Sequence, residues 1–314
     1  MKAAPGGRGR LAPARAHFGL KIASRIFAAL AVVVLALFAG TADAAQKPCV
    51  GAAARDPEQS CADDSKRVTP TPDEALITPN VACARGDLAE SCTYGSHVPL
   101  ATVALVGDSH AGHWRAGMDA LAKSRRWRVV EFARPHCPFS YSEPAPTEAG
   151  ANDCVAYNQR VVAWLASRPE VTSVFVSNNA RLPMAEKGID YKVQGHVAAL
   201  RALPPSVTRV FVLRDNPTAR VSTPDCIRRA VRRKLTPGTQ CAIARGRALV
   251  TDATAVAAQQ LGRTVIDLTP FFCSSKQCFP VVGGVLVHKD QDHLTQNFSR
   301  TLGPYIGRAV DRAG

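Results

Sequence analysis

Three residues, one in the first half of this sequence and two near its end, have the types that nucleophilic catalysis requires. Ser109 follows the apolar, β-branched run of residues 102–106 and precedes a stretch with helical spacing, so we expect it on a strand-to-helix turn. Asp290 and His293 form an Asp-x-x-His pair ahead of another predicted helix. A nucleophilic serine needs a base, and the base needs an orienting carboxylate. The pattern therefore predicts Ser109 as nucleophile, His293 as base and Asp290 as its partner.

The alternative role for Ser109 is helix capping, since serine is a preferred N-cap residue. In open α/β sheets, however, ligands bind beyond the carboxyl ends of the strands, and a helix N-terminus offers unpaired N–H groups to an oxyanion. Asp292 is adjacent to His293 and is expected to point elsewhere, so Asp290 is the predicted carboxylate. His110 is expected to project away from Ser109, either lining the pocket or capping the helix.

The paired motifs resemble those of the SGNH, or GDSL, hydrolase superfamily. Gly107-Asp-Ser-His110 is similar to its first block, and Asp290-x-x-His293 is similar to its last. Residues 106–114 and 265–273 resemble more particularly the SGNH domain found fused behind a membrane acyltransferase in bacterial envelope O-acylation proteins. The resemblance covers residues 80–310 and implies a flavodoxin-like α/β/α sandwich with a parallel central sheet. It also implies ester chemistry on a carbohydrate by a Ser109, Asp290 and His293 triad.

The resemblance extends in part to the oxyanion hole. Asn179 in Ser177-Asn-Asn-Ala180 matches the asparagine of the family's third block, whose amide donates to the oxyanion together with the nucleophile's own N–H, here that of Ser109. Ser177 and Ala180 depart from the family pattern, and a polar turn is the alternative role for Asn179. The second-block glycine has no clear counterpart, so an N–H within residues 133–137 is the alternative donor.

The N-terminal region predicts export. Residues 1–45 combine six Lys and Arg with an apolar stretch over 26–40 and small residues at 42–44, which is typical of a signal peptide. A membrane span needs about 20 apolar residues, so cleavage is favoured over an anchor. The mature chain is then expected in the periplasm or outside the cell. Residues 46–99 are predicted to be an extended, disulfide-stapled arm, and residues 100–314 the SGNH hydrolase-like domain.

Strands and helices are predicted to alternate after residue 101. Such alternation favours a parallel sheet with helices on both faces. The last helix should place Phe298, Leu302 and Ile306 on one face. The other expected elements are strands over 102–106, 128–132, 171–177, 207–213 and 264–267, and helices over 111–123, 153–166, 193–202 and 243–261.

Ten cysteines in an exported chain predict disulfides rather than metal ligands. Other connectivities stay open, because spacing alone does not fix the pairing. The Cys-x4-Cys spacing lacks the second close pair of a zinc site, so neither a metal nor another cofactor is expected. The simplest scheme joins sequence neighbours: Cys49 with Cys61, Cys83 with Cys92, Cys137 with Cys154, Cys226 with Cys241, and Cys273 with Cys278.

The chain is moderately basic. Its net charge is +14, and +9 once the six basic residues and one acidic residue of the predicted signal peptide are removed. A basic surface favours an anionic envelope polymer, with a solvated surface as the alternative. No nucleic-acid partner is expected. A basic cluster around Cys226 is interpreted as a solvated helix face, with a glycan or phosphate contact as the alternative; it comprises Arg220, Arg228, Arg229, Arg232, Arg233 and Lys234.

These observations predict a carbohydrate O-acetylesterase or O-acetyltransferase that works through an acyl-Ser109 intermediate. Its partners would be an acylated envelope glycan and a separately encoded membrane acyltransferase, and the chain is expected to be a monomer. The sequence does not decide whether water or a sugar hydroxyl receives the acyl group. The alternative is a non-catalytic glycan-binding module of the same fold, which the altered second and third blocks favour.

Overall fold

The structure is a computed structural model that describes residues 49–314, except residues 60, 64, 89 and 150. The predicted signal peptide of residues 1–45 lies outside the described residues. Among the helices of the described part, none is long and apolar enough to cross a lipid bilayer.

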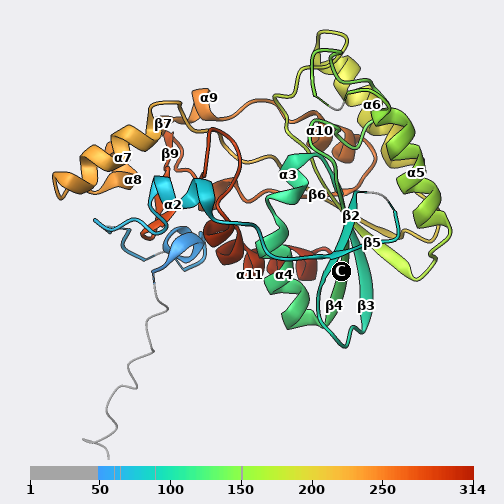
Figure 1. Cartoon of the computed structure of the whole chain (residues 1–314), viewed down its shortest axis with the longest axis horizontal. Coiled ribbons are helices and arrows are strands. Elements are labelled where there is room, and N and C mark those ends of the chain that lie inside the picture. The colour runs from blue at the N-terminus through green and yellow to red at the C-terminus, as the bar shows by residue number, and fades with distance from the viewer. Residues whose placement is uncertain (1–48, 60, 64, 89, 150) are drawn as a thin grey trace, which may run out of the picture. The chain divides into compact units, whose positions relative to one another are not determined.

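A seven-stranded sheet lies at the centre of the fold (Figure 1). In chain order its strands are β1 (Ala84–Arg85), β2 (Ser91–Gly95), β3 (Ala101–Gly107), β4 (Trp127–Ala133), β5 (Val171–Ser177), β6 (Arg209–Leu213) and β8 (Thr264–Ile266). Their order across the sheet is β1-β2-β4-β3-β5-β6-β8. The pairs from β4 to β8 are parallel, whereas β2 runs antiparallel to both β4 and β1. The predicted parallel sheet is therefore confirmed.

Helices cover both faces of the sheet. Strand β3 shows how the two faces are built: Val103 and Leu105 pack into the hydrophobic cluster of the first face, and Ala104 and Val106 into that of the second. All four side chains are buried, as expected for a parallel strand covered on both sides. The architecture is the predicted α/β/α sandwich. The first face carries α3 (Ser109–Gly112), α4 (Arg115–Arg125) and α11 (Gln296–Arg312), and the second carries α5 (Cys154–Ala166), α6 (Ile189–Arg201) and α10 (Ala253–Gln260).

The last helix, α11, has the buried face that its sequence predicts. Thr295 precedes it as N-cap, and its hydroxyl accepts a hydrogen bond from the Phe298 N–H at 3.1 Å. Phe298, Leu302 and Ile306 are each 0 % exposed. Since the cap fixes where α11 begins, it also fixes the position of the loop that carries Asp290 and His293.

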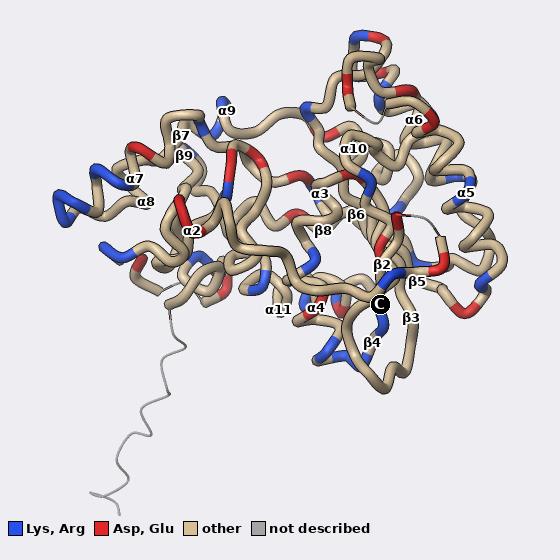
Figure 2. Tube along the Cα trace, viewed as in Figure 1, with Lys and Arg blue, Asp and Glu red and all other residues tan. Residues whose placement is uncertain are grey.

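The remaining elements flank the sandwich. They are η1 (Gly51–Arg55), α2 (Pro72–Ile77), α7 (Thr223–Arg232), α8 (Pro237–Gln240), α9 (Arg245–Ala248), η2 (Thr269–Phe271), β7 (Ile243–Ala244), β9 (Gln277–Cys278), β10 (Val281–Val282) and β11 (Val285–Leu286). Helices α2, α7 and α8 border a small separate hydrophobic cluster that includes Ala75, Ile227 and Leu286. Figure 2 shows that α7 carries much of the predicted basic cluster.

Residues 243–261 do not form the single helix that we predicted. The segment begins as β7, which pairs with β9, and α9 ends at Ala248. Helix α10 starts anew after Asp252, whose carboxylate accepts hydrogen bonds from the Thr254 and Ala255 N–H groups. Alanine-rich composition favours helix, but strand pairing and a strong N-cap divide the segment.

The described residues of the predicted arm, from residue 49 to residue 99, contribute to the main sandwich. Strand β2 pairs with β4 along five residues, and Tyr94 of β2 is buried in the core. Ala52 and Ala54 of η1 are buried in the same cluster. The domain boundary that we placed after residue 99 stays a prediction.

The ten cysteines lie in five pairs, each joining sequence neighbours. One pair, Cys137–Cys154, links the loop after β4 to the start of α5. Another, Cys83–Cys92, links the segment before β1 to β2. The other pairs are Cys49–Cys61, Cys226–Cys241 and Cys273–Cys278.

Peptide mapping of the unreduced mature protein should therefore yield five local bridges and no free thiol. The short separations between the paired cysteines make each bridge assignable from a single linked peptide pair. A peptide joining Cys137 to Cys273 would show that the connectivity is wrong.

Candidate active site

Ser109 stands at the carboxyl end of the central strand β3, in the first turn of α3. It does not cap that helix. The N-cap is Asp108, whose carboxylate accepts the His110 N–H at 2.8 Å and the Asn179 N–H at 2.9 Å. The Ser109 hydroxyl is therefore left for the site, and its N–H belongs to the first helical turn, which has no intrahelical partner to offer it.

Gly107 allows the strand to end in this position. Its φ is +147°, and a Cβ at this position would lie 1.8 Å from the Ser177 carbonyl oxygen. Only glycine permits so close an approach of β3 to β5. The two strand ends that carry Ser109 and Asn179 are consequently held side by side.

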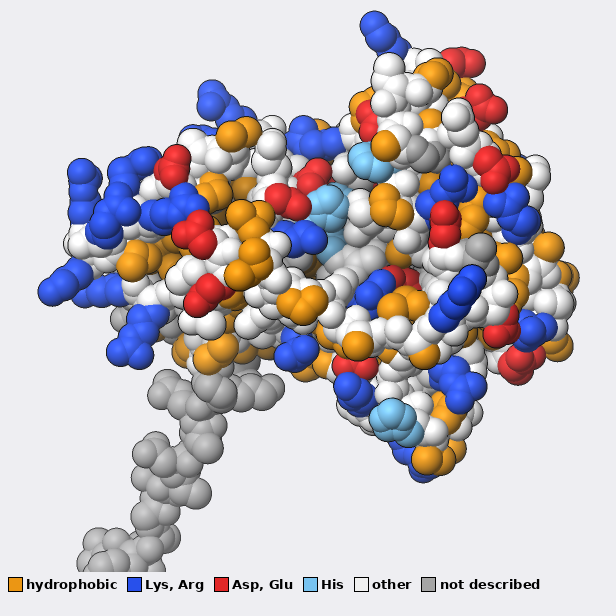
Figure 3. Space-filling view, in the orientation of Figure 1, with side chains coloured by type: hydrophobic (Ala, Val, Ile, Leu, Met, Phe, Trp, Pro, Cys, Tyr) orange, Lys and Arg blue, Asp and Glu red, His pale blue; other side chains and the backbone are white. Residues whose placement is uncertain are grey.

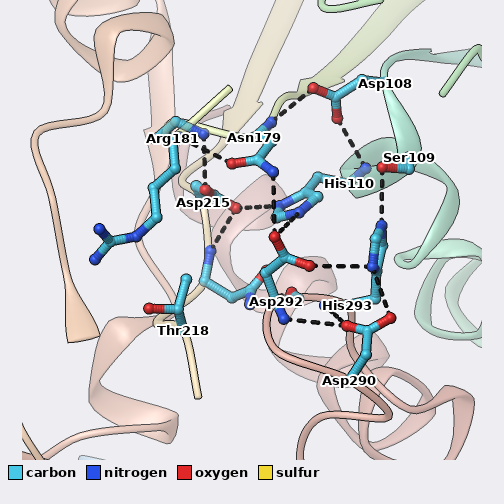
Figure 4. Close-up of polar contacts among 12 residues, drawn as sticks. Asp108, Ser109, His110, Asn179, Arg181, Asp215, Thr218, Asp290, Asp292 and His293 are labelled. Atoms are coloured by element: carbon cyan, nitrogen blue, oxygen red, sulfur yellow. Dashed lines mark hydrogen bonds and ion pairs between the residues drawn. The ribbon is translucent and has the colours of Figure 1, made fainter. Parts of the chain in front are cut away.

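The structure brings Ser109, His293 and Asp290 together, as Figure 4 shows. His293 Nε2 lies 2.8 Å from Ser109 Oγ, and His293 Nδ1 lies 2.9 Å from Asp290 Oδ2. The loop folds back because the other Asp290 oxygen accepts the backbone N–H groups of Asp292 and His293. These distances suit a hydrogen-bonded serine, imidazole and carboxylate.

Our expectation that Asp292 points elsewhere was wrong. Its Oδ1 lies 3.1 Å from His293 Nδ1, so two carboxylates meet the same imidazole nitrogen. Its Oδ2 accepts a hydrogen bond from Asn179 Nδ2 at 3.3 Å and lies 3.9 Å from His110 Nε2. The tight turn closed by Asp290 directs both side chains inward, which adjacency in sequence does not reveal.

The two carboxylates set the charge of the imidazole. Burial opposes protonation of His293, but hydrogen bonds with Asp290 and Asp292 outweigh it and raise its pKa to about 9. Burial would raise the pKa of Asp290, yet its hydrogen bonds from His293 hold it below the ordinary value. Contact with His110 and then with His293 lowers the pKa of Asp292. The resting site is therefore an imidazolium between carboxylates.

The oxyanion donors are only partly in the predicted arrangement. The Asn179 side chain reaches the site, but its Nδ2 donates to Asp292 and its Oδ1 accepts the Arg181 N–H. In the loop of residues 133–137, the Arg134 N–H donates to the Gly107 carbonyl, and proline 135 has no N–H. The oxyanion role of Asn179 stays a prediction.

A cavity of about 240 Å³ opens beside Ser109 and His293. Figure 3 shows exposed histidine in the middle of this face of the molecule. Sequence reasoning missed most of its lining, because those residues come from distant segments without a motif. The polar lining residues include Thr78, Asn80, Arg115, Glu131, Lys289, Gln296 and Asn297.

An ion pair between half-buried Arg115 and buried Glu131 forms part of this lining. Arg115 Nη2 lies 2.5 Å from Glu131 Oε1, and Glu131 is 1 % exposed. Arg115 also donates to the Val81 carbonyl, so its guanidinium is fixed from two sides. A rigid polar wall of this kind offers donors and acceptors to hydroxyl-rich ligands.

One group of side chains in the described residues is compact enough to hold a metal ion. Ligand atoms of His110, Asp292 and His293 lie within 4.8 Å of one another. The same atoms already balance charge among themselves, since imidazoles face the carboxylate. The arrangement fits ion pairing as well as coordination.

The fold and the serine at the carboxyl end of its central strand define an α/β/α hydrolase-like protein. Residues 78–308 match the model of the SGNH domain (fused to AT3 domains), so the chain belongs to this family. No curated protein is a significant match.

The chain is similar to solved structures of other proteins. The periplasmic domain of a lipopolysaccharide acetyltransferase from Salmonella ser. Paratyphi A is 14% identical, with a TM-score of 0.54 over 69% of this chain and 84% of that one. A carbohydrate acetylesterase family member from Sinorhizobium meliloti is 12% identical, with a TM-score of 0.36 over 68% of this chain and 100% of that one.

We predict that the imidazole signals of His293 titrate with a midpoint at about 9 in an NMR pH series. His196 is the internal control, because burial lowers its pKa to about 4 and should keep it neutral throughout. A His293→Gln variant identifies the signal. A midpoint near the ordinary histidine value of about 6.5 would contradict the described contacts with the two carboxylates.

Proposed function

We propose that the chain is a serine-dependent ester hydrolase or O-acyltransferase acting on a cell-envelope carbohydrate. The observation that carries the proposal is the run of contacts from Ser109 through His293 to Asp290, at 2.8 and 2.9 Å, beside an open polar cavity. Nucleophile, base and orienting acid in this order are the requirements of acyl transfer.

In the proposed reaction, neutral His293 accepts the Ser109 proton as Oγ attacks the ester carbonyl carbon. The resulting imidazolium returns that proton to the departing alcohol oxygen as the ester C–O bond breaks, which leaves an acyl-Ser109 intermediate. Water or a sugar hydroxyl then attacks the acyl carbon, His293 takes its proton, and Ser109 leaves with that proton restored. Asp290 holds Nδ1–H throughout, so that Nε2 faces Ser109.

The oxyanion of each tetrahedral intermediate needs donors on the cavity side of Ser109. The Ser109 N–H in the first turn of α3 is the first proposed donor, and it lies at the positive end of a local peptide dipole. The Asn179 amide is the second, and it must exchange its bond with Asp292 for one with the oxyanion. Losing one donor of this kind typically costs about a hundred- to a thousand-fold in rate.

A sugar suits the cavity. Its lining combines amide, hydroxyl and guanidinium groups, which can form hydrogen bonds with the hydroxyls of a carbohydrate. The family name and the lipopolysaccharide acetyltransferase domain of similar fold support a short acyl group on a carbohydrate. Acetyl is the acyl group that we propose.

Export and a membrane partner belong to the same proposal. The five cysteine pairs suit an oxidising compartment, and the structural neighbour is a periplasmic domain. Because the family is named for its fusion to AT3 domains, a separately encoded membrane acyltransferase is the proposed acyl donor. We propose a periplasmic or extracellular monomer.

A second candidate is a glycan-binding module of the same fold without turnover. The Asn179 amide favours it, because that amide is bonded to Asp292 instead of facing Ser109. Hydrolysis of p-nitrophenyl acetate separates the two candidates, since a binding module shows none. A screen of acetylated envelope polysaccharides then distinguishes acetate released from acetate transferred.

Ser109→Ala is expected to lower p-nitrophenyl acetate hydrolysis by at least about a thousand-fold, because the attacking oxygen is lost. Ser124→Ala is the matched control: this α4 serine is exposed and bonds only to the Leu121 carbonyl among its described contacts. Both variants should keep the wild-type thermal midpoint. Undiminished turnover by folded Ser109→Ala protein would refute the nucleophile assignment.

Asp290→Asn is expected to lower kcat/KM by about ten-thousand-fold, since an amide can hold the wrong imidazole tautomer. Asp292→Asn should lower kcat/KM less than Asp290→Asn does, and it should shift the pH profile of kcat/KM. Wild-type kcat/KM should rise with pH up to about 9, where His293 loses its proton. Removing the Asp292 charge lowers the pKa of His293, so the rise should come at lower pH. Equal losses of kcat/KM in the two variants, with unchanged pH profiles, would show that neither carboxylate controls the orientation or protonation of His293.

A further inference from the structure

A second histidine–carboxylate pair is buried directly behind the candidate triad. His110 Nδ1 lies 2.6 Å from Asp215 Oδ1, with His110 0 % and Asp215 7 % exposed. Asp215 is itself fixed, because its Oδ2 accepts the Ala180 N–H at 2.8 Å and its own N–H donates to Asp252 Oδ2 at 2.9 Å. The reaction proposed above uses neither His110 nor Asp215.

The other edge of His110 faces the site. Its Nε2 is buried without a hydrogen-bond partner, and the nearest charged oxygen is Asp292 Oδ2 at 3.9 Å. The His110 ring centre lies 5.1 Å from that of His293. Figure 4 shows the resulting order: Asp215, His110, Asp292 and His293, with Ser109 at the end.

The charges around His110 favour an imidazolium. Burial would lower its pKa, but the carboxylates of Asp215, Asp292 and Asp108 outweigh burial and raise it well above the ordinary value. The neighbouring imidazoles oppose this only weakly. Burial lowers the pKa of His113 well below its ordinary value, and burial lowers that of His288 to about 4, so both rings are neutral. His293 is the remaining cation beside His110.

We propose that His110 and Asp215 are positioning residues that hold the Asp292 carboxylate between His110 and His293. Asp215 fixes the His110 ring, and the Nε2 edge of that ring attracts Asp292 Oδ2 away from His293. Asp290 is thereby left as the principal partner of Nδ1. The inference deepens the proposed function, on which it rests, by assigning a role to the histidine that follows the nucleophile.

The consequence for His293 has a definite sign. Without the His110 cation, Asp292 is free to pair wholly with His293, and one positive charge near His293 is lost. Both changes stabilise the protonated form of His293. A higher pH is then needed to obtain the neutral base, so the activity of the variant at pH 7 falls while substrate affinity is unaffected.

The test compares wild-type protein with His110→Gln, Asp215→Asn, Asp292→Asn and the His110→Gln/Asp292→Asn double variant, using p-nitrophenyl acetate. His110→Gln and Asp215→Asn should each shift the rising limb of kcat/KM to higher pH by about one unit, a roughly tenfold loss at pH 7, with KM within about twofold. In the Asp292→Asn background, the His110→Gln shift should be clearly smaller, because the part that acts through Asp292 is lost and only the direct charge effect on His293 remains. Additive effects or an unmoved pH profile would overturn the proposal.

His196→Gln is the matched control. His196 is also buried; its Nδ1 lies 2.9 Å from the Phe139 carbonyl oxygen and its Nε2 lies 3.3 Å from Thr254 Oγ1, so its described hydrogen bonds include no member of the triad. This variant should lower the thermal midpoint without moving the pH profile. A shift of the profile equal to that of His110→Gln would mean that any buried-histidine change perturbs the site, and would overturn the proposal.

A measurement on unmodified protein remains decisive if these variants do not fold. The imidazole ¹⁵N spectrum at pH 7 should show His110 protonated on both nitrogens. An unprotonated Nε2 would overturn the proposal. This readout needs no catalysis. If wild-type protein hydrolyses no ester, the proposed function fails while the spectrum still decides the state of His110. If wild-type protein is active and Ser109→Ala protein is not, an unprotonated His110 Nε2 refutes only the positioning role of His110 and Asp215.

Discussion

The close packing of α11 against α4 is the constraint on which the site depends. A Cβ on Gly117 would lie 2.5 Å from the Ser299 carbonyl oxygen, and one on Gly303 would lie 2.6 Å from the Gly117 carbonyl oxygen. The Gly117 N–H also donates to Ser299 Oγ at 3.1 Å. Because α4 follows the nucleophile turn and α11 follows the loop of the base, this glycine contact brings His293 to Ser109 across 184 positions of the sequence.

Around that contact the site is organised by charge. Carboxylates and imidazoles alternate from the buried Asp215 outward, so each ionised group has an opposite charge beside it. Such a series of charged groups orients its members without direct contact between Asp215 and His293. It also engages the Asn179 amide, which donates a hydrogen bond to Asp292. The electrostatic order that holds the base is thus linked to the donor proposed for the oxyanion.

Much of the fold followed from patterns local in sequence. The β-branched run of β3, the buried face of α11 and the fold-back of Asp290 onto His293 each depend on neighbouring residues. The division of residues 243–261 did not follow, because it depends on pairing with β9. Nor did the inward turn of Asp292 or the burial of His110 against Asp215. The His110–Asp215 contact joins residues 105 positions apart, and Asp292 also meets Asn179 at 113 positions, so composition and spacing carry no signal for these contacts.

The central claim is that Ser109 carries the acyl group, and trapping the intermediate tests it most directly. Wild-type protein mixed briefly with p-nitrophenyl acetate, quenched in acid and digested should be analysed by mass spectrometry. The account predicts one acetyl group on the peptide containing Ser109, placed by fragmentation on that serine and absent from Ser109→Ala protein. Ester turnover with no acetyl on Ser109, or with the acetyl on another residue, would contradict the account.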